Sequence, residues 1–138
     1  MNRMFLLTSA LALAIIVSGS VFGADDKSPS IKEVMEALHG EDGKGGIKAK
    51  VTTAFKDKAW DDVQAGAKDW VKQAESLSKG KPTKGSEASW KKLTTAYEKN
   101  AQALTEAAEK KDSAKTKAAL TKLSISCGSC HGAHKPKK

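Results

Sequence analysis

Apolar residues recur at spacings of three and four over most of the chain after residue 30, and this spacing places them on one face of an α-helix. The longest such run comprises Trp60, Val63, Ala67, Trp70, Ala74 and Leu77. No segment shows the alternation of β-branched residues that is typical of a half-buried strand. The sequence therefore predicts an all-α fold.

Capping residues and glycines predict where the individual helices begin and end. Ser30 and Glu33 fit a capping box, in which each side chain accepts a hydrogen bond from a backbone N–H at a helix start. Gly40 is expected to end this helix after His39, and the glycine-rich stretch 40–46 then forms a loop. The segments expected to be helical are 30–39, a short one at 47–55, 59–77, 86–108 and 113–135.

The predicted helices are long enough to form one bundle. Short loops join them, and Ser86 or Ser89 and Asp112 or Ser113 are suitable caps for the last two. With 138 residues, of which 39% are hydrophobic and 29% charged, the chain suits one soluble domain better than a multi-span membrane protein or a disordered chain. We expect an antiparallel four-helix bundle. Its expected aromatic core residues are Phe55, Trp60, Trp70, Trp90 and Tyr97.

The first 23 residues have the pattern of a secretory signal peptide. Arg3 precedes the apolar run 5–17, and small residues follow it up to Gly23. The run is too short for a bilayer span, which needs about 20 residues, so no stable membrane anchor is expected. The predicted domains are a signal peptide at 1–23 and a helical-bundle domain at 24–138, and the predicted location is the periplasm.

The basic character of the chain comes almost entirely from lysine. The formal net charge is +8, and Arg3 is the single arginine. Base-specific readers of nucleic acids depend on the planar, bidentate guanidinium group, which this chain lacks after Arg3. Specific nucleic-acid recognition is therefore not expected.

A C-x-x-C-H motif lies near the C-terminus, as Cys127-Gly128-Ser129-Cys130-His131. This is the pattern of a c-type haem attachment site. Two thiols one helical turn apart can add to the two vinyl groups of one porphyrin, and the histidine that follows is then held at the iron as an axial ligand. The motif predicts one covalently attached haem c.

The motif allows three other interpretations. A zinc site could use Cys127, Cys130, His131 and His134, but four ligands within eight residues of one helix hardly surround a metal ion tetrahedrally. A thioredoxin-like redox pair lies at a helix N-terminus after a strand, which is not the predicted setting here. An ordinary disulfide or two free thiols would need no cofactor. Haem attachment accounts for all three motif residues together.

With its signal peptide, its predicted bundle and this C-terminal motif, the chain resembles the class II c-type cytochromes, which include cytochrome c′ and its low-spin relatives. The resemblance implies thioether bonds at Cys127 and Cys130 and a proximal iron ligand at His131. It also implies that Met35, in the first helix, is the second axial ligand, as in the low-spin members. Two departures are the glycine-rich break after the first helix and His134-Lys135 in place of the usual aromatic-basic pair.

The second axial position has three possible states: Met35 as ligand, His39 as ligand, or an open iron. At about 100° per residue, Met35 lies about 50° and His39 about 90° from the centre of the first helix's apolar stripe. Met35 therefore points inward more directly, although a methionine in such a stripe also fills a core well. His39 could instead face solvent or a haem propionate.

These expectations favour an exported electron carrier rather than an enzyme, since no nucleophile with a paired base is evident. The alternative is a five-coordinate, cytochrome c′-like protein that binds small gases such as nitric oxide.

The lysines that follow the motif, Lys135, Lys137 and Lys138, predict docking to an acidic redox partner. A homodimer is compatible with the resemblance. His134 is expected at the surface or at the haem edge.

Overall fold

The computed structural model describes residues 28–136, and within this range every regular element is an α-helix. The signal-peptide prediction at 1–23 and the tail residues Lys137 and Lys138 lie outside the described residues. The prediction of an all-α fold is confirmed. No helix in the described part of the chain is long and apolar enough to cross a bilayer. The helices are α1 (Ile31–His39), α2 (Gly46–Lys56), α3 (Trp60–Lys79), α4 (Glu87–Glu109) and α5 (Ser113–His134).

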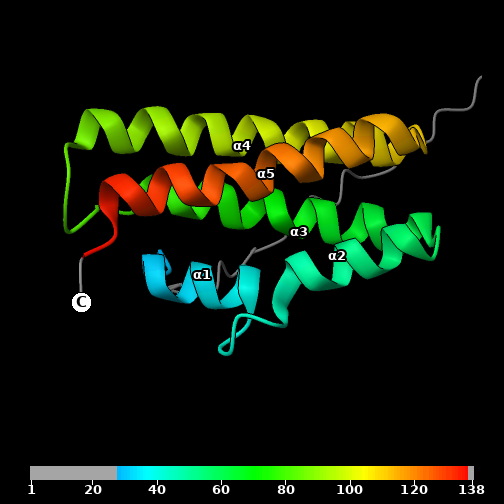
Figure 1. The fold of residues 1–138 in the computed structure, drawn as a ribbon, viewed down its shortest axis with the longest axis horizontal. Coiled ribbons are helices and arrows are strands. Elements are labelled where there is room, and N and C mark those ends of the chain that lie inside the picture. Colours follow the sequence, from blue (N-terminus) through cyan, green and yellow to red (C-terminus); the bar gives the residue numbers. More distant parts are fainter. Residues whose placement is uncertain (1–27, 137–138) are drawn as a thin grey trace, which may run out of the picture.

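The five helices form a bundle (Figure 1). Helices α3, α4 and α5 are the three long members, with α4 packed between α3 and α5. Helices α1 and α2 follow one another along α3 and together take the place of one bundle helix (Figure 1). The five predicted helical segments are all present among the described residues, with α1 and α2 sharing one position of the expected four-helix bundle.

Glycine geometry explains why the first bundle helix is divided in two. Gly40 and Gly46 have φ values of 78° and 74°, in the left-handed region that glycine adopts without strain. A Cβ atom on Gly46 would lie 2.6 Å from the backbone of Leu38. The turn between α1 and α2 is thus too tight for a side chain at this position.

The predicted caps are present. Ser30 Oγ accepts a hydrogen bond from the Glu33 backbone N–H at 3.3 Å, and Glu33 accepts one from the Ser30 backbone N–H at 2.7 Å. Ser86 caps α4, and Asp112 caps α5 by accepting a hydrogen bond from the Lys115 backbone N–H at 3.0 Å. Each cap satisfies backbone donors that a helix start leaves without a partner.

The core is centred on α3 and α4, which bury their apolar stripes against each other. Between them Trp70 Nε1 donates a hydrogen bond to the Tyr97 hydroxyl at 2.7 Å. Of the other predicted aromatic core residues, Trp90 is buried, whereas Phe55 and Trp60 are half-buried and meet edge to face at 5.9 Å. Helices α3 and α4 together form the wall against which α1, α2 and α5 lie.

Candidate functional site

A cavity of about 680 Å³ lies beside this wall, between α1 and α5. Cavities of roughly 300 to 1,000 Å³ are typical of small-molecule and cofactor sites. Helix α1 contributes Met35 and His39, and α4 contributes Trp90 and Tyr97. Helix α5 contributes Cys127, Cys130 and His131. The structure therefore brings every sequence-predicted site residue to one cavity.

The two cysteines lie one turn apart on α5, half-buried and free. The Cys127 thiol lies 3.5 Å from the Leu123 carbonyl, to which it donates. Burial, with a smaller effect of Cys127, raises the pKa of the Cys130 thiol. Both sulfur atoms thus face the same cavity from one helix, as attachment to a single porphyrin requires.

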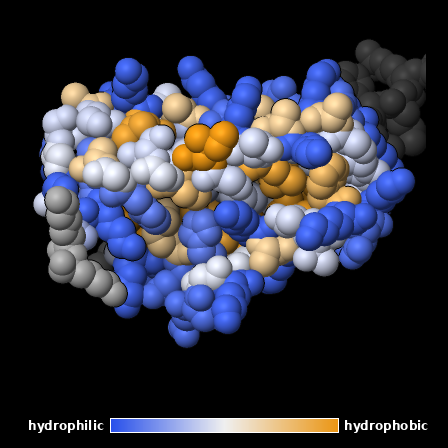
Figure 2. All heavy atoms as spheres, in the orientation of Figure 1, coloured by the Kyte–Doolittle hydropathy of each residue, from blue (hydrophilic) through white to orange (hydrophobic). Residues whose placement is uncertain are grey.

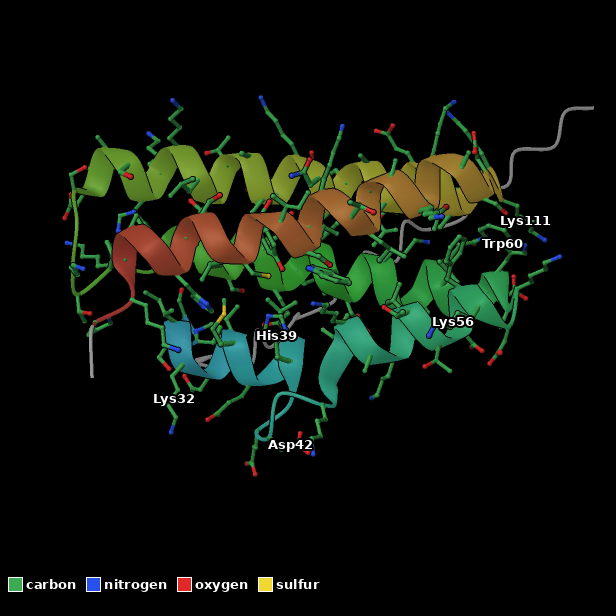
Figure 3. The ribbon with its side chains drawn as sticks, in the orientation of Figure 1. Lys32, His39, Asp42, Lys56, Trp60 and Lys111 are labelled. Atoms are coloured by element: carbon green, nitrogen blue, oxygen red, sulfur yellow. The ribbon has the colours of Figure 1, made fainter. Side chains whose placement is uncertain are left out.

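His131 and His39 reach the cavity from opposite helices. His131 is exposed and follows Cys130 on α5, whereas His39 is half-buried at the end of α1, on the side facing α5 (Figure 3). Burial lowers the pKa of His39, and the positive charges of Lys48 and His131 lower it further. These effects favour the neutral form of the His39 ring, which is the form that binds a metal.

Met35 precedes His39 by one turn of α1. Its side chain is half-buried, lines the cavity and packs against the hydrophobic core. The two side chains considered for the second axial position are therefore both available to a group bound between α1 and α5.

His134 does not lie at the surface, because only 5% of it is exposed, and it lines the same cavity as the motif residues. Its Nδ1 lies 2.7 Å from the Lys84 carbonyl oxygen, and its Nε2 lies 3.2 Å from Ser89 Oγ. The ring also meets Trp90 edge to face at 5.2 Å. Since the carbonyl can only accept, Nδ1 carries the proton.

These bonds show what His134 does in the fold. They fasten the end of α5 to the loop before α4 and to the first turn of α4. Both ring nitrogens are engaged, which leaves none for the zinc site considered above. Within the described residues, no group of three or more His, Cys, Asp or Glu side chains is placed to hold a metal ion.

Sequence reasoning missed the polar rim of the cavity and one stretch of its wall. Lys32 and Glu36 line it from α1 and form an ion pair of 3.4 Å. Pro82 and Thr83 line it from the loop between α3 and α4. The spacing of four between Lys32 and Glu36 indicates a helical ion pair. Nothing in the local sequence indicates that the loop between α3 and α4 lies against the cavity.

The cavity fits the group that the motif predicts. Its walls are mainly hydrophobic and aromatic, its two free thiols lie on one helical face, and a histidine follows them directly. The soft thioether of Met35 and the imidazole of His39 supply further iron ligands from α1. Haem c is therefore compatible with the residues present.

Comparison with known proteins gives one family model that is similar to part of the chain. Residues 85–135 match a family model described as Cytochrome C′. This segment covers α4, α5 and the whole Cys127–His131 motif, whereas α1, α2 and α3 lie outside it. Neither the curated proteins nor the solved structures gave a match. The match supports a haem c-type cytochrome, and over α4 and α5 the chain is similar to the class II, cytochrome c′-like family.

Proposed function

We propose that the protein is an exported electron carrier that holds one haem c in the cavity between α1 and α5. Cys127 and Cys130 form the thioether bonds, His131 is the proximal ligand, and Met35 is the second axial ligand. The observation that carries this proposal is that all four side chains, from two separate helices, line one cavity.

Each wall of the cavity has a part in this function. Bound haem supplies a one-electron iron couple. The soft sulfur of Met35 favours the reduced state of that couple, which raises its potential. The buried rings of Trp90 and Tyr97 keep water from the inner wall. If His131 and Met35 both hold the iron, little rearrangement would accompany electron exchange.

A second candidate function is the binding of a small gas such as nitric oxide at a five-coordinate iron. This candidate rests on the resemblance to cytochrome c′, whose distal site is open, and the family match is compatible with both functions. In that case Met35 serves only to pack the cavity wall.

Absorption spectra of three proteins distinguish these functions: the unmutated protein, Met35→Leu and His39→Gln. Met35→Leu removes the sulfur while conserving side-chain volume, so packing changes little. We expect a low-spin spectrum for the unmutated protein and for His39→Gln. Met35→Leu is expected to become high-spin, to bind carbon monoxide readily when reduced, and to have a lower potential.

Two results would change the assignment. A low-spin Met35→Leu beside a high-spin His39→Gln would make His39 the second axial ligand. High-spin iron in the unmutated protein would favour gas binding over electron transfer.

Export and periplasmic location are part of the proposal and rest on the pattern of residues 1–23. Expression of the full chain in a bacterial host should yield a periplasmic protein whose N-terminus is Ala24 by mass spectrometry. Recovery of the uncleaved chain with the membranes would contradict this.

A further inference from the structure

The outward side of α5 is unlike the outer sides of the other helices. Its apolar residues do not gather on one side, and Ile125 has 66% of its surface exposed. Among the described residues, Ile125 is the one large hydrophobic side chain that is exposed. Figure 2 shows hydrophobic atoms reaching the surface over this helix. Most of the Ile125 surface is therefore not used in the packing of its own chain.

The neighbours of Ile125 make a flat face. At about 100° per residue, the residues on its side of the helix are small, and the buried residues Leu123 and His134 lie on the opposite side. A Cβ atom on Gly128 or Gly132 would have no neighbour within 4 Å. We call this surface the α5 outer face, formed by Ala118, Thr121, Ile125, Gly128, Ser129 and Gly132.

Lysines surround the α5 outer face. The exposed Lys117, Lys122 and Lys135 lie along its margins. Residues 113–138 hold six of the 24 basic residues of the chain and none of the 16 acidic ones. Most of the net charge of +8 is therefore concentrated on this helix and the tail that follows it.

We propose that the α5 outer face is the docking surface for an acidic electron-transfer protein. This inference rests on the proposed function. The cavity-lining Cys127 and Cys130 lie on the inner side of the same helix, so a docked partner is separated from them by one helix diameter, about 10 Å. The basic margin steers an acidic partner, and Ile125 supplies an apolar contact at the centre.

The same features disfavour two other occupants. Two copies of this chain that met through this face would bring like charges together. Insertion into a lipid surface needs a broad apolar side with several large side chains, whereas this face offers Ile125 alone. A small face with a charged margin suits a weak, transient complex.

The test measures reduction of the ferric haem protein by two reductants in stopped-flow experiments. Reduced flavodoxin is the acidic protein probe, and reduced lumiflavin is the small neutral probe. The variants are Lys122→Glu and Ile125→Ser. The matched control is Lys99→Glu, which makes the same charge change on the exposed side of α4, two residues from the buried Tyr97.

At low ionic strength, Lys122→Glu should slow reduction by flavodoxin about tenfold, and this difference should shrink as salt is added. Ile125→Ser should slow it several-fold at every salt concentration. Lys99→Glu should have little effect, and all variants should react with lumiflavin at the unmutated rate.

Equal effects of Lys99→Glu and Lys122→Glu, or no effect of either, would overturn the docking surface. A protein whose haem lumiflavin cannot reduce would instead contradict the proposed function. Vesicles of phosphatidylglycerol supply a further check. If the unmutated protein sediments with them and Ile125→Ser does not, the face binds lipid and the proposal is wrong.

Discussion

Helices α3 and α4 bury their apolar sides against each other, whereas α1 and α5 each turn several side chains toward a cavity. In the first pair, Trp70 and Tyr97 are buried and joined by a hydrogen bond of 2.7 Å. In the second pair, Met35 and Cys127 are only half-buried. The difference indicates that α3 and α4 complete each other's packing, whereas under the proposed function the haem would complete the packing between α1 and α5.

Removal of the haem should produce the largest contrast between the two regions. In Cys127→Ser/Cys130→Ser, α1 should lose hydrogen-exchange protection by about a hundredfold or more, because its inner side would have lost a partner. Helices α3 and α4 should keep most of theirs. Mass-spectrometric exchange on peptides from each helix measures both. Equal loss in α1 and α4 would show that the two regions are not distinct.

Leu104→Ala should mainly lower the free energy of unfolding, whereas Met35→Leu should mainly change the absorption spectrum of the haem. Leu104 is fully buried on α4, so its truncation should lower the free energy of unfolding by about 2 to 5 kcal/mol and leave the haem spectrum unchanged. Met35→Leu should cost less than about 1.5 kcal/mol and change the spectrum. Denaturant titrations and absorption spectra of both proteins make the comparison. A spectral change in Leu104→Ala would mean that the core and the cavity are coupled.

Tyr97→Phe tests the hydrogen bond within the packed pair. Removal of the hydroxyl leaves Trp70 Nε1 buried without its acceptor, which should cost about 1 to 3 kcal/mol. Urea unfolding of Tyr97→Phe measures this loss, with Ser129→Ala on the exposed side of α5 as the control. A loss equal to that of the control would show that the bond contributes no stability.

Tyr97→Phe should also alter the stability of the protein at alkaline pH. Burial raises the pKa of Tyr97 above its usual value, despite an opposing effect of the Trp70 hydrogen bond. The unfolded chain therefore loses this proton first, and stability falls as the pH rises above about 10. The fall should be smaller in Tyr97→Phe. Identical alkaline unfolding of the two proteins would exclude Tyr97 as its source.

The smallest effects should come from the helix caps. Ser30→Ala and Ser86→Ala each remove a hydroxyl that accepts a hydrogen bond from a backbone N–H, at a cost of about 1 kcal/mol. Ser30→Ala should loosen α1 and increase hydrogen exchange there, whereas Ser86→Ala should lower the stability of the whole bundle. If Ser30→Ala increased hydrogen exchange equally in all helices, the prediction that its effect is confined to α1 would be wrong.

The parts of the fold that could be predicted from sequence are those with local signals. The stripe from Trp60 to Leu77 predicted α3, and Ser30 with Glu33 predicted the start of α1, because both patterns lie within single helices. The loop after His39 was also predicted. The sequence did not predict that α1 and α2 together replace one bundle helix, because this depends on how both helices pack along α3.

Some residues of the candidate site could likewise be predicted from the sequence, and others could not. The Cys127–His131 motif is contiguous and could be identified without the fold. The role of His134 could not, because its partners Lys84 and Ser89 lie 50 and 45 residues away. The exposure of Ile125 could not be predicted from the sequence either. Its exposure is a property of the assembled bundle, in which α4 packs on the opposite side of α5.

The central claim is that the cavity between α1 and α5 holds a covalent haem, and mass spectrometry under denaturing conditions tests it most directly. The full chain is produced with c-type haem maturation machinery, alongside Cys127→Ser/Cys130→Ser and the control Ser129→Ala, which leaves both thiols and His131 in place. We predict that the unmutated protein and Ser129→Ala carry the added mass of one haem, and that the double variant carries none. An unmutated protein found only at the mass of the bare chain would contradict the claim.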